Sequence, residues 1–381
     1  MSTLPAKVKS LSLKQFTAFS DATFHFSPGI NVIIGANATG KSHVLKIIYT
    51  LLKVCQAARR RNVSYGSKLD DMLVQKLEGV FRFTGTVSDL IHNLNGSGMA
   101  PRMAEVSLDC TDQGISCKIY DDETRSSQVA PIGHDKMASS AQLPNPSPPI
   151  YLPAIEFLSV SEGFIAAYTN RETPFDETFY DLSLALNALP LRSDKLIDLQ
   201  ELIGFLAELI AGKEAGCLAN AERIVTQKEG RFYLRLPEGE LNAQLVAEGY
   251  RKMATLLYLL RNGSLSKDSI LFWDEPEANL NPKLVVKMVE LLRSFAALGM
   301  QIFVTTHDYL FSHELSLLAE YPSKARVEMK FFALHKPDRL KGATLEAAKT
   351  LAEIEHNAIL DEFSAHYDRQ VALFTAVGTD E

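Results

Sequence analysis

Residues 30–42 read Ile-Asn-Val-Ile-Ile-Gly-Ala-Asn-Ala-Thr-Gly-Lys-Ser, and they carry the most specific motif in the chain. The compact apolar run Ile30–Ile34 predicts a buried strand that ends at Gly35. Residues 35–42 then match the pattern G-x-x-x-x-G-K-[ST] in full. The glycines let the backbone turn so that its N–H groups point at phosphates. The helix predicted from His43 to about Leu52 presents its positive N-terminal end to the same anion. The stretch therefore predicts a phosphate-binding loop between a strand and a helix.

The residues of this loop have distinct expected roles in binding ATP with Mg²⁺. Lys41 is expected to bind the β and γ phosphates and to act as a catalytic residue. The Ser42 hydroxyl is expected to ligate Mg²⁺. The loop residues expected to contact the nucleotide are Gly35, Asn37, Ala38, Thr39, Gly40, Lys41 and Ser42.

A second buried strand is predicted at Ser269–Trp273, and it ends in two adjacent carboxylates, Asp274 and Glu275. An apolar strand that runs into acidic residues is common, but beside a phosphate-binding loop it favours a Walker B site. Asp274 is expected to hold Mg²⁺ through its water shell. Glu275 is expected to orient and polarise the attacking water as general base.

A third short strand, Gln301–Thr305, precedes His307. The stretch Leu284–Leu298 between this strand and Glu275 has the apolar spacing of a helix. A strand–helix–strand unit places His307 and Glu275 at the same carboxyl edge of a parallel sheet, where ligands bind. There His307 is expected to hydrogen-bond the γ-phosphate and to act as a catalytic residue.

Together these motifs resemble ABC-superfamily ATPases of the RecF, SMC and OLD type, a branch often called AAA-family ATPases in bacterial genomes. The opening LSLKQFTAFSDATFHFSPGINVIIGANATGKS is similar to that branch's N-terminal hairpin and Walker A motif. SILFWDEPEANLNPKL is similar to its Walker B motif and D-loop, and IFVTTHD to its switch-histidine strand. The resemblance implies an α/β fold: an ABC-type P-loop NTPase with a mixed central sheet, an N-terminal antiparallel β lobe and an inserted helical lobe. It also implies ATP and Mg²⁺ as ligands, and it places Asn281 of the D-loop at the nucleotide.

The segment LVAEGYRKMATLLYLL stands where this family has its signature motif. Gly249 is expected to open a helix whose N-terminus faces a γ-phosphate, with Arg251 and Lys252 adding positive charge. The motif departs from the family pattern, because it has no serine and because Glu248 adds a negative charge. At the position of the family's Q-loop the chain carries Glu156. Two alternatives stay open for Glu156: a side chain that reaches the metal region, or an ordinary strand-to-helix turn.

The resemblance implies an ATP-dependent homodimer. In this family each ATP is held between the Walker A motif of one subunit and the signature helix of the other. The chain has one Walker A and one Walker B motif, so one copy supplies only half-sites, and two copies complete them by two-fold symmetry. A heterodimer with a relative and a slowly turning monomer are the alternatives.

The motifs divide the chain into an ATPase core at residues 1–55 and 230–340, an inserted β and helical lobe at 56–229, and a C-terminal helical extension at 341–381. The insert is expected to contain a helix around Leu69–Leu77 and strand-like segments at Val80–Phe83, Glu105–Cys110 and Ile115–Tyr120. Residues 176–225 are expected to form a helical hairpin broken near Pro190. Only about 45 residues follow Lys336, too few for the Toprim nuclease domain of OLD-type proteins, so no nuclease activity is expected.

Composition and charge narrow the functional classes. The chain has 381 residues and a net charge of −7. No apolar run approaches the roughly 18 residues that span a bilayer, and the four cysteines are scattered, so a reducing cytoplasm and no membrane partner are expected. The leading hypothesis is an ATP-driven switch for a separately encoded effector, a nuclease or toxin, in anti-phage defence. A RecF-like DNA-binding ATPase is the alternative. The run Arg59–Arg61 is expected to be the solvated end of a helix, with a phosphate-contacting patch as the other interpretation. A transporter motor is disfavoured by the long insertion between Lys41 and Gly249.

Overall fold

The strand that precedes the phosphate-binding loop lies inside a six-stranded sheet. This computed structural model describes residues 6–92, 102–121, 127–131, 142–213, 221, 223–321, 327–336, 338 and 342–377. All six residues of β3 (Ile30–Gly35) are buried, as an apolar strand covered on both faces requires. The sheet order is β14-β13-β3-β12-β11-β7, parallel throughout except for the antiparallel pair β13–β14. The other strands are β7 (Pro149–Leu152), β11 (Ile270–Asp274), β12 (Gln301–Thr306), β13 (Met329–His335) and β14 (Thr344–Ala348).

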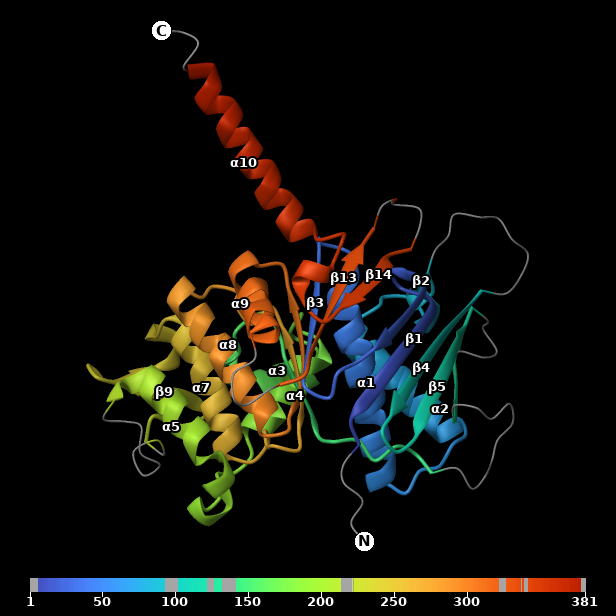
Figure 1. Ribbon diagram of the computed structural model, residues 1–381. Helices are drawn as coiled ribbons and strands as arrows, with labels where there is room; N and C mark the ends of the chain where they lie inside the picture. The colour runs from blue at the N-terminus through green and yellow to red at the C-terminus, as the bar shows by residue number, and fades with distance from the viewer. Residues whose placement is uncertain are drawn as a thin grey trace.

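A separate antiparallel sheet forms the N-terminal lobe, in the order β2-β1-β4-β5-β6. Strands β1, β2, β4 and β5 alternate buried residues with more exposed ones, as expected for a sheet with one face on the core. The buried face packs on α1 (Lys41–Arg60) and α2 (Ser67–Phe81), and together they form one hydrophobic core. Figure 1 shows this lobe as the blue and cyan part of the molecule. The strands are β1 (Val8–Phe16), β2 (Phe19–His25), β4 (Met103–Cys110), β5 (Gly114–Tyr120) and β6 (Ser127–Pro131).

Helices on the other side of the six-stranded sheet form the second core. α7 (Glu248–Arg261) is buried along eleven of its fourteen residues. A three-stranded antiparallel sheet, β10-β9-β8, also contributes to this core. The elements here are α3 (Phe164–Thr169), α4 (Glu177–Leu186), α5 (Gln200–Ala211), α8 (Pro282–Ala297), α9 (Tyr309–Glu320), β8 (Val225–Lys228), β9 (Arg231–Leu236) and β10 (Gly239–Asn242). Short 3-10 turns lie at Val87–Leu90, Leu158–Val160, Ser193–Leu199, Ala243–Leu245 and Leu351–Glu353.

These layers confirm the predicted α/β fold with a mixed central sheet and an antiparallel β lobe. The division into core and insert stays a prediction. Two strands of the predicted insert pair with strands of the predicted core: β7 pairs with β11 in the central sheet, and β4 pairs with β1 in the antiparallel sheet.

Two local predictions are wrong. No strand forms at Val80–Phe83: its first two residues end α2, because Val80 continues the buried helical series of Leu69, Leu73 and Leu77. The predicted C-terminal extension is not helical from its start, because β14 comes first and pairs with β13. The helix α10 (Ala358–Val377) follows and projects away from the rest of the molecule (Figure 1).

The basic run lies at the C-terminal end of α1. Arg59, Arg60 and Arg61 are all exposed, and the Arg59 guanidinium donates a hydrogen bond of 2.8 Å to the Leu143 carbonyl. Among the helices that the structure describes, none has the length and apolar character needed to cross a bilayer.

Candidate nucleotide-binding site

The loop between β3 and α1 depends on glycine at two positions. Gly40, immediately before α1, has a φ of +97°, and a Cβ there would lie 2.9 Å from the Phe19 ring. Gly35 has a φ of +150°, and a Cβ there would lie 2.5 Å from the Leu334 carbonyl oxygen. Residues other than glycine rarely adopt these backbone conformations. The packing of the β lobe and of β13 therefore demands glycine where the phosphate-binding pattern has it.

Lys41 is folded over this loop. Its Nζ donates hydrogen bonds to the carbonyls of Gly35 (2.8 Å) and Ala36 (3.0 Å). The Thr39 hydroxyl donates to the same Ala36 carbonyl at 2.9 Å. Burial lowers the pKa of Lys41, while Glu275 and Asp274 oppose that shift. A partly desolvated ammonium interacts more strongly with an anion than one in bulk water, which suits a phosphate contact.

The Asp274 carboxylate at the end of β11 accepts hydrogen bonds from three hydroxyl groups. Ser42 Oγ donates to its Oδ1 at 3.0 Å, and Thr305 of the neighbouring strand β12 donates to the same oxygen. The buried Tyr151 of β7 donates to Oδ2 at 3.3 Å. The expected metal pair Ser42 and Asp274 is therefore side by side. A hydroxyl and a carboxylate at this spacing are the hard oxygen donors that Mg²⁺ prefers beside substrate phosphates.

The expected catalytic pair also meets. His307 Nδ1 lies 3.0 Å from Glu275 Oε1, and both side chains are partly exposed at the edge of the sheet. Glu275 has a φ of +48°, an uncommon conformation for a residue with a side chain and one that clusters at functional sites. Its backbone N–H is fixed by the Thr305 carbonyl at 3.1 Å. The arrangement leaves a carboxylate and an imidazole facing solvent beside Asp274.

Gly249 and Asn281 make their contacts elsewhere, at the start of α7 and α8. A Cβ at Gly249 would lie 2.9 Å from the Leu284 side chain. Asn281 caps α8, because its Oδ1 accepts from the Leu284 N–H at 3.0 Å. These two expected nucleotide contacts thus lie together, in the α7–α8 region.

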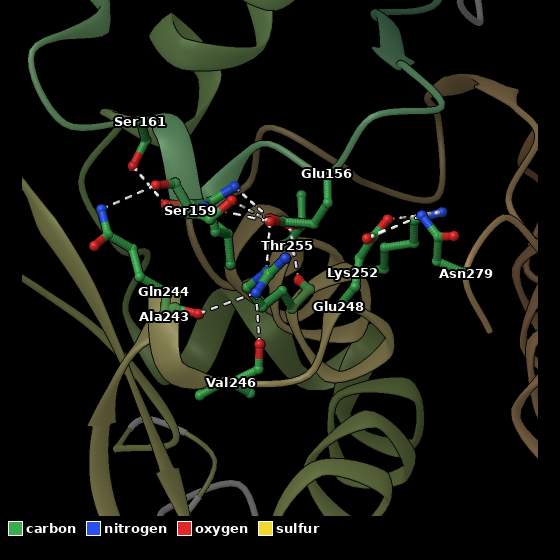
Figure 2. A network of polar contacts seen from close by, with 12 residues as sticks. Glu156, Ser159, Ser161, Ala243, Gln244, Val246, Glu248, Lys252, Thr255 and Asn279 are labelled. Atoms are coloured by element: carbon green, nitrogen blue, oxygen red, sulfur yellow. Dashed lines mark hydrogen bonds and ion pairs between the residues drawn. The ribbon is translucent and has the colours of Figure 1, made fainter. Parts of the chain in front are cut away.

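The structure resolves the two alternatives for Glu156. Figure 2 shows Glu156 inside a polar network, where Arg251 Nε donates to it at 2.6 Å and Ser159 Oγ donates at 2.9 Å. The Glu156 side chain is only 3% exposed. Arg251 also donates to the Val246 carbonyl at 2.5 Å. Glu156 therefore does not reach the metal region, and Arg251 is bound within its own chain rather than directed at a phosphate.

A second set of contacts in Figure 2 joins the signature helix to the D-loop. Lys252 Nζ lies 3.8 Å from Glu248. It also donates a hydrogen bond of 2.7 Å to the Ala278 carbonyl of the D-loop. Asn279 Nδ2 donates to the other carboxylate oxygen of Glu248 at 3.0 Å. Burial lowers the pKa of Lys252, although Glu248 opposes that shift. The negative charge of Glu248 at the signature position is thus paired with Lys252 and hydrogen-bonded by Asn279.

Three residues near the site were not predicted: Tyr151, Thr305 and Glu277. Glu277 is 6% exposed, accepts a hydrogen bond of 2.5 Å from the Thr306 hydroxyl, and has its pKa raised to about 7 by burial. The pairing of β7 with β11 carries Tyr151 to Asp274, and a polar residue inside the apolar segment IYLP was the available signal. Thr305 and Thr306 are polar residues at the end of a strand, directly before His307. That position could have indicated that Thr305 lies near the site and that Thr306 contacts Glu277.

Comparison with known proteins agrees with this geometry. A family model described as "AAA domain, putative AbiEii toxin, Type IV TA system" matches residues 30–312. The DNA replication and repair protein RecF of Limosilactobacillus reuteri (strain DSM 20016) is 51% identical over 41 residues, which is 11% of each chain. RecF of Streptococcus pyogenes serotype M1 is 33% identical over 96 residues, 25% of this chain and 26% of that protein. The matches thus span about a tenth to a quarter of the length of these relatives.

The fold is also similar to a solved structure, an SmcHead bound to the C-winged helix domain of ScpA. The TM-score is 0.52 at 15% identity, and the match covers 91% of this chain and 98% of that one. The chain belongs to the AAA-domain family that its model match defines, and its fold is similar to that of an SMC head.

Proposed function

We propose that this chain is an ATPase that acts as a nucleotide-driven switch, in which two copies close head to tail around ATP and separate after hydrolysis. One observation carries the proposal. Lys41, the Ser42–Asp274 pair and the Glu275–His307 pair share one edge of the sheet, whereas Gly249 and Asn281 make their contacts in the α7–α8 region. A second copy, related by a two-fold axis, would bring its own Gly249 and Asn281 to the nucleotide.

Ser42 and Asp274 are the residues that would hold Mg²⁺, which when bound neutralises charge on the β and γ phosphates. Lys41 binds the same phosphates. The Glu275 carboxylate orients the attacking water and accepts its proton. His307 hydrogen-bonds the γ-phosphate, and its contact with Glu275 keeps the ring at the edge of the sheet. Tyr151 and Thr305 hold the Asp274 carboxylate in one orientation.

The N-terminus of α7 supplies the contact in trans. Its helix dipole favours an anion, and Gly249 leaves space for close approach. The missing serine weakens this contact by one hydroxyl. The negative charge of Glu248 is held by Asn279 and Lys252, which supports a working signature position despite its departure from the family pattern.

The output of the switch is proposed to be a separately encoded nuclease or toxin in anti-phage defence, within the cytoplasm. The family description links such AAA domains to type IV toxin–antitoxin systems, which supports a defence setting, although it names no separate effector. The free and buried Cys55, Cys110 and Cys117 suit a reducing compartment. A RecF-like role on DNA is the second candidate, favoured by the RecF matches and by the exposed run Arg59–Arg61, and opposed by the net charge of −7.

ATP turnover of the purified chain, measured with and without double-stranded DNA, separates these two roles. The switch proposal predicts slow turnover that DNA leaves unchanged, with co-purification of an effector from the native host. Stimulation by DNA that disappears when Arg59, Arg60 and Arg61 are all changed to Ala would replace it with the RecF-like role.

A further inference from the structure

The C-terminal helix α10 carries an apolar stripe that its own chain leaves exposed. Tyr367 is 65% exposed and Phe374 is 83% exposed. The stripe residues recur at intervals of three and four, so they lie on one face of the helix. They are Leu360, Phe363, Tyr367, Val371 and Phe374. Figure 1 shows α10 leaving the body as an isolated helix.

The base of α10 is fixed beside the nucleotide site. Asn357 accepts from the Ile359 and Leu360 N–H groups at 3.1 Å and 3.2 Å and so caps the helix. The Phe363 ring lies 4.3 Å from the ring of Tyr309, two residues after His307. The helix therefore starts in a defined direction from the edge of the sheet that carries Glu275 and His307.

A groove of about 370 Å³ lies between α5, α7 and α8. Its apolar lining is Phe205, Leu209, Tyr250 and Leu284. Its charged lining is Lys213, Lys283 and Lys287, with Glu208 as the one carboxylate. Tyr250 follows Gly249 and Lys283 follows Asn281 by two residues, so the groove borders the two segments that are expected to face a second copy.

The charges of the helix and the groove are complementary. Asp361 and Asp368 are seven residues apart and border the same side of the apolar stripe. The described part of α10 contains three carboxylates and a single arginine, Arg369, so the helix is acidic. The groove has three lysines against one glutamate. An acidic helix is poorly suited to an anionic membrane surface, which favours basic helices.

We propose that α10 of one copy packs into the groove between α5, α7 and α8 of the second copy when ATP closes the dimer. This inference rests on the proposed head-to-tail dimer. In that dimer, Gly249 and Asn281 of the first copy face the phosphate-binding loop of the second copy, and they border the groove of the first copy. The helix α10 of the second copy starts from the same sheet edge as its phosphate-binding loop, and therefore close to that groove. The stripe covers Phe205, Leu209 and Tyr250, and Asp361 and Asp368 face the lysines.

Cross-linking between two variants that each carry one introduced cysteine tests this packing in trans. One variant carries Asp368→Cys and the other Lys283→Cys. Both also carry Cys217→Ser, because the other described cysteines are already buried, and Glu275→Gln, so that bound ATP is not hydrolysed. The inference predicts a mixed disulfide dimer that forms with Mg²⁺-ATP, only in the mixture. Arg369→Cys, on the face of α10 opposite the stripe, should give none with Lys283→Cys.

Light scattering on the same samples separates the possible failures. An ATP-dependent dimer without a disulfide between the two introduced cysteines would overturn the docking of α10 and leave the switch in place. A chain that stays monomeric with ATP would contradict both proposals. A Tyr367→Cys variant that cross-links to itself would show two α10 helices paired with each other, and would also overturn the proposed groove.

Discussion

Glu275→Gln is expected to lower ATP turnover by about 100-fold or more, because general-base catalysis contributes roughly 10²–10⁴. The glutamine keeps the size of the side chain and its contact with His307 but cannot accept the proton of the attacking water. ATP binding should persist, so the ATP-bound dimer should accumulate. Steady-state phosphate release and light scattering with Mg²⁺-ATP measure the two effects.

Glu290→Gln is the matched control for this variant. Glu290 lies on α8 in a partly exposed pair with Lys287 at 2.8 Å, remote from the chemistry, and its turnover should equal that of the wild type. Equal turnover in Glu275→Gln and wild type would remove Glu275 as the base. The carboxylate Glu277, buried near the same strand ends, would then be the next candidate to test.

Lys41→Ala is expected to weaken ATP binding by about 100-fold or more, close to 3 kcal/mol. The variant loses a charge-assisted hydrogen bond to phosphate, and the loop carbonyls of Gly35 and Ala36 lose the donor that holds them. Titration calorimetry with ATP measures the binding, and a thermal melt by circular dichroism checks that the fold is retained.

Arg60→Ala is the control for Lys41→Ala, since it removes a cation from the exposed end of the same helix. It should bind ATP as the wild type does. Tight ATP binding by a folded Lys41→Ala chain would contradict the assignment of the phosphate-binding loop.

The parts of the site that the sequence predicts are those that local pattern determines. β3, β11 and β12 are short apolar runs that end in polar residues, and parallel pairing brings the ends of neighbouring strands to one edge. That rule places Asp274, Glu275 and His307 together without any knowledge of distant contacts. The full phosphate-binding pattern adds Lys41 and Ser42 for the same reason.

The parts that the sequence does not predict depend on long-range pairing. Arg251 and Glu156 are 95 residues apart, and nothing in either segment indicates that the two charges meet. The hydroxyl of Tyr151 reaches Asp274 only because β7 pairs with β11. Residues 344–348 form a strand because β13 offers a free edge, which outweighs a pattern that also suits a helix.

Complementation between two inactive variants tests the central claim, that each ATP site is shared between two copies. Lys41→Ala removes the loop lysine and keeps α7 intact, whereas Gly249→Asp places a second carboxylate at the start of α7 and keeps the loop. Each variant alone should be inactive. An equal mixture should regain about a quarter of wild-type turnover, because half of randomly paired dimers are mixed and each has one complete site. A mixture as inactive as its components, or normal turnover by Gly249→Asp alone, would contradict the shared site.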